Sequence, residues 1–308
     1  MKQIVSIQLA VCGFAITGVL HAGLVFTAAT SPSAAGLQPT VDAFRTLIGG
    51  GTVAGPNGSF GGIRREINWD GVPDSFADPS LMPATFFVNT SPRGLGLASA
   101  PGAGVTGFEV SAKAASGNPT LFESFDGPSG GNGTYDFAAF SQERIFTPVG
   151  GHVFDIVMFE PGTGFANPSF VKAFGIVFVD NVSSTFPQCA SIQAFNGATS
   201  LGFRCANPTT VGGFSFLGVE ATGADVITSL RINLGNATIG TPQGNSETGF
   251  NEVVVVDDFI YSEPGRATLG DPASAPEPST TYALAGGLLT LVGLIKRRRG
   301  TAGRKSTR

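Results

Sequence analysis

Short apolar segments separated by clusters of turn residues occupy most of the chain between residues 85 and 261. They are rich in Val, Ile and Phe, which favour strands. The segments are residues 85–88, 105–110, 144–146, 153–159, 174–179, 192–195, 201–205, 214–219, 226–234 and 253–261. Glycine, proline and asparagine separate them, as in Pro161–Gly164. This spacing predicts an all-β fold, a two-sheet antiparallel β-sandwich of jelly-roll type, and not an outer-membrane barrel with its alternating strands.

Helical periodicity is nearly absent between the two ends of the chain. No stretch of a dozen residues there repeats its apolar positions at the 3.6-residue period of a helix. Residues 41–45 form the only compact apolar cluster of the Gly-rich segment 36–63, and they fit either a short helix or a first strand. Apart from that cluster, we expect helices only at the ends, as an N-terminal signal helix and a short C-terminal transmembrane helix.

Residues 1–35 have the composition of a secretory signal peptide. Lys2 supplies the positive start, and an apolar run follows from Ile4 to Leu20. Small residues at 27–29 and 33–35 offer two cleavage sites. We expect signal peptidase to remove this segment. A permanent N-terminal anchor is the alternative, but no charge cluster that would stop transfer follows the apolar run.

The end of the chain combines three features in a fixed order. Pro276, Glu277 and Pro278 precede an apolar segment at 281–295, and a basic cluster follows it. The basic cluster consists of Lys296, Arg297, Arg298 and Arg299. A 15-residue helix is about 22 Å long, shorter than the ~30 Å hydrocarbon core, so it suits a transient span better than an ordinary tail anchor. The basic residues would keep the tail at 300–308 in the cytoplasm.

Residues 276–299 resemble the PEP-CTERM sorting signal of Gram-negative bacteria, which is read by exosortase, a membrane-embedded cysteine transpeptidase-like enzyme. The tail from Gly300 to Arg308 is longer than is usual for this signal. The resemblance implies transient insertion into the inner membrane, processing by an exosortase-type enzyme, and delivery to the cell surface or extracellular matrix. The middle of the chain, from Arg65–Gly71 to Asp257–Ile260, resembles a domain of uncharacterised exported bacterial proteins, which implies no activity.

One domain, expected at residues 36–264, lies between these ends, and a linker follows at 265–275. The whole chain has 18 basic and 22 acidic residues. Without Lys2, the seven basic residues of the tail and Glu277, ten basic and twenty-one acidic residues remain, a net charge of −11. Such a domain lacks the positive surface that nucleic acids require. The 26 Phe and single Trp of the whole chain predict a core filled by phenylalanine.

Two cysteines, Cys189 and Cys205, flank a predicted hairpin that contains Asn196–Gly197, a strong turn dipeptide. A three-residue loop centred on Gly197 would place them directly opposite each other. A five-residue loop from Asn196 to Ser200 would offset them by about one pair. In an exported domain either register predicts a disulfide, worth about 3 kcal/mol in the chain-entropy model. A metal site or catalytic thiol would need a histidine or further thiols nearby, and the sequence has none there.

The strongest predicted strand, 253–261, contains the acidic pair Asp257 and Asp258. Neighbouring residues of a regular strand point to opposite faces, so we do not expect both carboxyls on one face. A buried aspartate needs a basic side chain, backbone N–H groups or a cation. Asp180 could supply a further oxygen, so Asp257, Asp258 and Asp180 form a candidate calcium site. A surface acid pair with satisfied hydrogen bonds is the alternative.

Two further residues, Trp69 and Asp70, form a candidate sugar-binding platform, with a core tryptophan as the alternative. The sequence nominates no catalytic residues for a hydrolase. The expected domain has a single histidine, His152, and no Gly-x-Ser-x-Gly motif, and no carboxylate pair stands out for glycoside cleavage.

These observations predict an exported, non-enzymatic β-sandwich protein with a structural or adhesive role in an exopolysaccharide matrix. A calcium-stabilised carbohydrate-binding module is the alternative, and a hydrolase is the third hypothesis. The expected partners are signal peptidase, an exosortase-type enzyme and exopolysaccharide.

Overall fold

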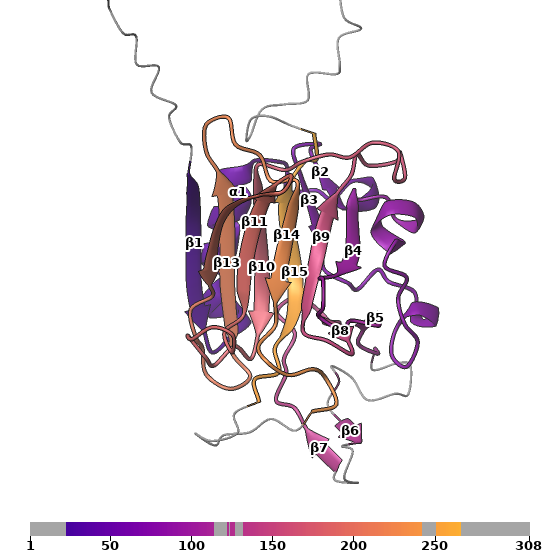
Figure 1. Cartoon of the computed structure of the whole chain (residues 1–308), viewed down its shortest axis with the longest axis vertical. Helices are drawn as coiled ribbons and strands as arrows, with labels where there is room; N and C mark the ends of the chain where they lie inside the picture. The colour runs from indigo at the N-terminus through magenta and orange to yellow at the C-terminus, as the bar shows by residue number, and fades with distance from the viewer. Residues whose placement is uncertain (1–22, 114–121, 123, 127–131, 242–250, 266–308) are drawn as a thin grey trace, which may run out of the picture.

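The computed structural model describes residues 23–113, 122, 124–126, 132–241 and 251–265 (Figure 1). Most of the expected signal peptide and the whole of 276–299 lie outside these residues. Within the described part of the chain, no helix has both the length and the apolar character needed to cross a membrane.

The structure is mostly β, with two antiparallel sheets and one long helix (Figure 1). Sheet A has the order β1-β13-β10-β15-β3-β2, with β8 paired to β15 and β5 to β8. Its strands are β1 (Leu24–Ser31), β2 (Ser59–Phe60), β3 (Arg64–Ile67), β5 (Gly107–Val110), β8 (Phe146–Val149), β10 (Ala173–Val179), β13 (Phe214–Ala221) and β15 (Val255–Ser262).

Sheet B has the order β12-β11-β14-β9-β4, and β6 pairs with β7 in a separate hairpin. These strands are β4 (Leu95–Ser99), β6 (Ser124–Asp126), β7 (Asn132–Thr134), β9 (Val153–Met158), β11 (Ser191–Asn196), β12 (Thr199–Cys205) and β14 (Ser229–Asn233). The remaining elements are α1 (Ala34–Ile48) and three short turns, η1 (Pro56–Gly58), η2 (Asp74–Phe76) and η3 (Phe86–Thr90).

Two apolar cores lie on opposite faces of sheet A. The larger core fills the space between the two sheets, where Phe174 and Ile176 of β10 join Ile192 of β11 and Ile232 of β14. The smaller core joins the other face of sheet A to α1. Every residue of β10 and β15 is therefore buried. This explains why their sequences are continuous apolar runs and do not alternate.

Helix α1 is the main element that the sequence pattern did not predict at its full length. The Ser33 Oγ accepts a hydrogen bond from Gly36 N–H (3.3 Å), as an N-cap does, and Gly49 ends the helix at φ 78°. Its buried residues, Leu37, Val41, Phe44 and Ile48, follow the helical period. Of the two options for 41–45, the helix is correct.

Two glycines of sheet A make room for α1. Gly175 of β10 pairs with Gly218 of β13, and the Phe44 ring lies over both. A Cβ would lie 2.8 Å from the ring at Gly175 and 2.6 Å from it at Gly218. Phe44 also contacts Phe216 edge to face, with ring centroids 5.2 Å apart. The helix can therefore approach the sheet closely only where the two strands lack side chains.

Three expectations about the elements need correction. Residues 24–31 form strand β1 along β13, and 34–48 form α1, so the expected signal-peptide boundary near residue 35 conflicts with a fold that uses 24–35. Residues 85–88 are not a strand, because Phe86–Thr90 forms one π-helical turn. Strand β4 at 95–99 escaped prediction because Gly, Ala and Ser weaken its strand pattern.

Candidate functional site

The outer face of sheet B carries a row of side chains that the strand register brings together. Gln193 of β11 lies opposite Phe203 of β12 on one side and Arg231 of β14 on the other. Arg231 in turn lies opposite Asp155 of β9. Residues on either side of these in β11 and β14 point into the core. Four neighbouring strands therefore present an aromatic ring, an amide and a charged pair on one open surface.

The charged pair on this face is a two-point ion pair. Arg231 Nε lies 2.8 Å from Asp155 Oδ1, and Arg231 Nη2 lies 3.0 Å from Oδ2. The hydrogen bond that Arg231 donates to Asp155 raises the pKa of Arg231. Both side chains remain partly exposed. The pair is therefore rigid while parts of both groups stay open to a ligand.

Two exposed phenylalanines border the polar row. Phe186 is 58% exposed and Phe203 is 45% exposed, and their rings contact each other edge to face at 5.3 Å. They line a hollow of about 340 Å³, which also contains Gln193, Arg231 and Asn233. A second hollow of about 210 Å³ continues the surface past Arg231 to Asp155 and Phe195. The outer face of sheet B thus joins exposed aromatic rings to polar groups.

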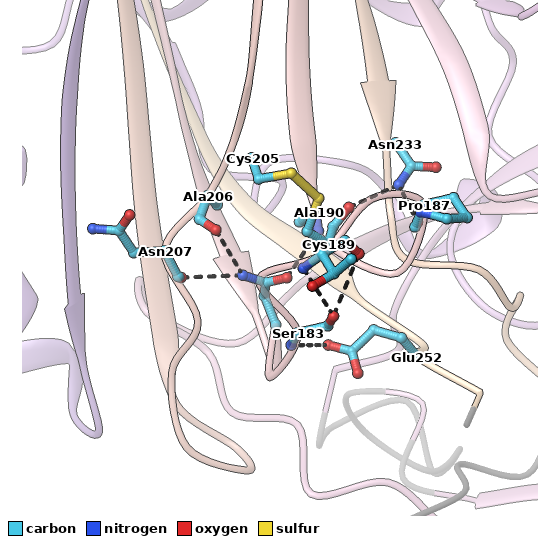
Figure 2. Close-up of a disulfide and its surroundings, with 11 residues drawn as sticks. Ser183, Pro187, Cys189, Ala190, Cys205, Ala206, Asn207, Asn233 and Glu252 are labelled. Atoms are coloured by element: carbon cyan, nitrogen blue, oxygen red, sulfur yellow. Dashed lines mark hydrogen bonds between the residues drawn. A yellow bond between two sulfur atoms is a disulfide. The ribbon is translucent and has the colours of Figure 1, made fainter. Parts of the chain in front are cut away.

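The disulfide holds the loop that carries Phe186. Cys189 and Cys205 are bonded as predicted, with Cα atoms 5.8 Å apart (Figure 2). The turn of the hairpin has two residues, Gly197 and Ala198, but a bulge shifts the register so that Cys205 pairs with Ser191. This is the register of the longer loop considered above.

Hydrogen bonds hold the same loop from both sides (Figure 2). Asn233 Nδ2 donates to the carbonyls of Pro187 and Cys189, both at 2.8 Å. Glu252 Oε1 accepts from the N–H groups of Val182 (2.5 Å) and Ser183 (3.2 Å). Burial raises the pKa of Glu252 to about 7. The disulfide and these contacts together fix Phe186 next to the sheet.

A bulge in β15 places Asp257 and Asp258 on the same side, contrary to expectation. Ile176 pairs with Phe259 and Phe178 with Val256, so Val177 alone faces both aspartates. Ser141 Oγ lies 3.0 Å from Asp257 Oδ1 and 2.6 Å from Asp258 Oδ1. A regular strand would have separated the two carboxyls.

The contacts of Ser141 and the burial of both carboxyls favour a state in which only one of the two is protonated. A serine hydroxyl has a single hydrogen, so it cannot donate to both Asp257 and Asp258. Burial raises the pKa of both groups, that of Asp257 strongly. Ser141, Asp257 and Arg45, whose Nη2 is 3.2 Å from Asp258 Oδ2, favour the ionised form of Asp258. We therefore assign the proton to Asp257 and the charge to Asp258.

The structure does not assemble the expected calcium ligands. Asp180 follows β10 and accepts a hydrogen bond from Gly212 N–H at 2.8 Å. In the described residues, no group of three or more Asp, Glu, His or Cys side chains is arranged to hold a metal ion. Asp257 and Asp258 are instead bound by Ser141 and Arg45, with backbone N–H groups of Phe140 and Ser141 on Asp257.

Trp69 and Asp70 have structural roles. Trp69 is only 1% exposed, stacks on Phe146 at 4.2 Å and donates from Nε1 to the Asp257 carbonyl, so it offers no face to a sugar. Asp70 Oδ1 accepts from the N–H groups of Glu143 (3.1 Å) and Arg144 (3.2 Å). The proposed platform is therefore wrong for Trp69, which belongs to the core.

Sequence reasoning missed the outer face of sheet B. Gln193 and Arg231 each lie between apolar residues that alternate along their strands, which is a local signal of exposure. Their meeting depends on the order β12-β11-β14-β9, which no local pattern encodes. Phe186 lies in a loop, where strand patterns do not apply. The missing information was therefore the pairing of distant strands.

Comparison with models of known protein families gives no match, and no curated protein or solved structure matches the chain significantly.

Proposed function

We propose that this protein is an exported adhesive protein of an extracellular polysaccharide matrix, and that it binds glycan through the outer face of sheet B. The observation that carries the proposal is the side-by-side arrangement of Phe203, Gln193, Arg231 and Asp155 on that face. The proposal concerns binding and includes no reaction.

The chemistry of this face suits a sugar chain. The exposed edges and faces of Phe186 and Phe203 can pack against the C–H groups of a pyranose ring. Gln193 and Asn233 offer amide groups that both donate and accept hydrogen bonds, as hydroxyl groups require. Arg231 and Asp155 add a charged donor and a charged acceptor in fixed positions. A sugar needs this mixture of apolar and two-way polar contacts.

The ends of the described chain support presentation of this face away from a membrane. Ala221 N–H, next to the start of β1 at Leu24, donates to the Lys172 carbonyl, and Lys172 N–H donates to Ser262 Oγ near the end of β15. Both ends therefore lie at one end of sheet A. The disulfide lies at the other end, because Asn181, just beyond β10, binds Ala190 and Ala206.

The route to the matrix is part of the proposal. The resemblance of 276–299 to a PEP-CTERM signal supports transient insertion through a short C-terminal helix at 281–295 and processing by an exosortase-type enzyme. The leader, Met1 to about Ala22, would be removed by signal peptidase ahead of β1. A jelly-roll type of sandwich is our finer description of the two sheets. Calcium is not required by this proposal.

The experiment compares two exposed phenylalanines. Phe203→Ala removes a ring from the outer face, whereas Phe165→Ala removes one that is 50% exposed and packs on Phe159, whose backbone pairs with Pro168. The exported protein and both variants are tested for retention on immobilised acidic and neutral exopolysaccharides and on a glycan array, with and without EDTA. We expect Phe203→Ala alone to weaken retention. Equal retention of the wild type and Phe203→Ala, or no retention of the wild type, would contradict the proposal.

A further inference from the structure

A second polar surface lies beside the bulge of β15 on sheet A, which shares no strand with sheet B. It is a cavity of about 310 Å³, called here the bulge cleft. Two arginines, two carboxylates, two amides and a hydroxyl belong to its lining: Arg45, Arg93, Glu66, Asp258, Asn57, Asn68 and Ser141. None of these residues lines the hollows of sheet B.

The two arginines of the bulge cleft differ in their partners. Arg45 forms ion pairs with Glu66 (3.0 Å), Asp258 (3.2 Å) and Asp42 (3.0 Å). Arg93 forms no ion pair within the described residues, and its buried Nε has no hydrogen-bond partner there. A largely buried cation without an anion is costly unless a ligand supplies one.

Arg93 is nevertheless held in place. Its guanidinium lies over the Phe87 ring, 5.0 Å from the centroid, and Nη1 donates to Ser91 Oγ at 2.6 Å. Gly58 covers Nε so closely that a Cβ at this position would lie 2.4 Å from it. These contacts fix the cation without neutralising it. A fixed guanidinium with an open charge is a ready partner for a carboxylate.

We propose that the bulge cleft binds a uronic acid residue of an acidic polysaccharide, with the sugar carboxylate on Arg93. The sugar hydroxyls donate to Glu66 and Asp258 and exchange hydrogen bonds with Asn68 and Ser141. The two carboxylates disfavour a phosphate dianion. Arg45, Arg64 and Ser141 already bind their oxygens, whose remaining lone pairs can accept from sugar hydroxyls, which a simple carboxylate lacks. This inference rests on the proposed polysaccharide binding but assigns a separate site and the acidic class of sugar.

The test measures binding of D-glucuronate, D-glucose and acetate to the exported protein by titration calorimetry or ligand-observed NMR. Loss of a hydrogen bond to a charged group corresponds to about tenfold or more in affinity. We expect Arg93→Met to weaken glucuronate binding by at least that factor and Arg93→Lys to weaken it less. Arg204→Gln, at an arginine that lies over the Phe26 ring and lines neither the bulge cleft nor the hollows of sheet B, should leave it unchanged. Glucose and acetate should each bind at least about tenfold more weakly than glucuronate.

Three results would overturn the inference: undetectable glucuronate binding by the wild type, equal binding of acetate, or unchanged binding in Arg93→Met. Should Arg93→Met fail to fold, Asn68→Ala, which changes the cleft without touching Arg93, must weaken glucuronate binding. Phe203→Ala separates this site from the proposed function. It should reduce retention on polysaccharide and leave glucuronate binding in the bulge cleft intact.

Discussion

The two sheets of this domain have the same kind of strands but different surroundings. Sheet A is covered on one face by sheet B and on the other by α1, whereas the outer face of sheet B is open. Buried carboxyl groups in sheet A, such as those of Asp257 and Asp258, need protein partners on every side. Those on sheet B, such as Arg231 and Asp155, satisfy each other and remain accessible. The covered sheet therefore provides stability, and the open sheet keeps polar groups accessible, as the proposed glycan binding requires.

The largest expected effect comes from the helix-covered face of sheet A. Phe44 is 2% exposed and fills the space over Gly175 and Gly218. Phe44→Ala removes a buried ring and leaves a cavity that the two glycine strands cannot close. We expect a loss of about 3–5 kcal/mol in the free energy of unfolding, measured by urea denaturation. A loss below about 1 kcal/mol would show that α1 packs loosely.

The second-largest effect is expected from the disulfide, which joins sheet B to the loop that carries Phe186. Replacing both Cys189 and Cys205 by serine should cost about 3 kcal/mol through the unfolded chain. It should also release the loop that carries Phe186. Retention on polysaccharide should therefore fall even at temperatures where the variant is folded. Full retention by the folded variant would mean that the hydrogen bonds of Asn233 position Phe186 alone.

The free energy of unfolding is expected to depend on pH through two buried carboxyls, those of Glu252 and Glu109. Burial raises the pKa of Glu252 to about 7 from 4.5, and it raises that of Glu109, beside Asp78, to about 7 as well. The folded state then binds protons more tightly than the unfolded state. The stabilisation is complete below about pH 4.5 and is lost as the pH rises through 7.

We therefore expect the urea midpoint to fall between pH 5 and pH 8. Glu252→Gln keeps an oxygen that accepts from Val182 and Ser183 but cannot ionise. Its midpoint should fall less over this range, with Glu109 responsible for the remaining slope. A slope as steep as that of the wild type would show that Glu252 does not contribute.

The smallest effect on stability is expected on the open face. Phe203 is 45% exposed, so Phe203→Ala should change the free energy of unfolding by about 0.5 kcal/mol or less. The same variant should lose retention on polysaccharide. Thermal denaturation and retention measured on one preparation test both statements. A large loss of stability would mean that Phe203 belongs to the core of sheet B and not to a binding surface.

The different surroundings of the sheets also decide how much the sequence could reveal. The apolar runs at 174–179, 214–219 and 253–261 predicted β10, β13 and β15 well, because strands buried on both faces need apolar residues throughout. Helix α1 was underestimated because its four buried residues are spread over 15 positions among small and polar ones. The packing of α1 on Gly175 and Gly218 involves strands far away in the sequence, so no local pattern reveals it.

The candidate sites were less predictable than the fold. The cysteine pair followed from the hairpin signal, whereas Asp257 and Asp258 were expected as calcium ligands or a surface pair and instead bind Ser141 and Arg45. Their position on one side results from a bulge, which depends on how β15 pairs with β10 and not on β15 alone. Arg93 carries no local signal, because its missing partner is a property of the folded surroundings.

The place of β15 in sheet A affects when the protein can fold. Among the described strands, β15 is the last in the chain, and it lies between β10 and β3. The first, β1, pairs with β13, so Leu24 can pair with Ala221 only after nearly 200 further residues have been synthesised. Neither core can close until Ser262 has left the ribosome or, in an exported chain, the translocation channel. Contacts so distant in sequence make folding slow. The nascent chain therefore cannot complete either core until almost the whole domain has emerged.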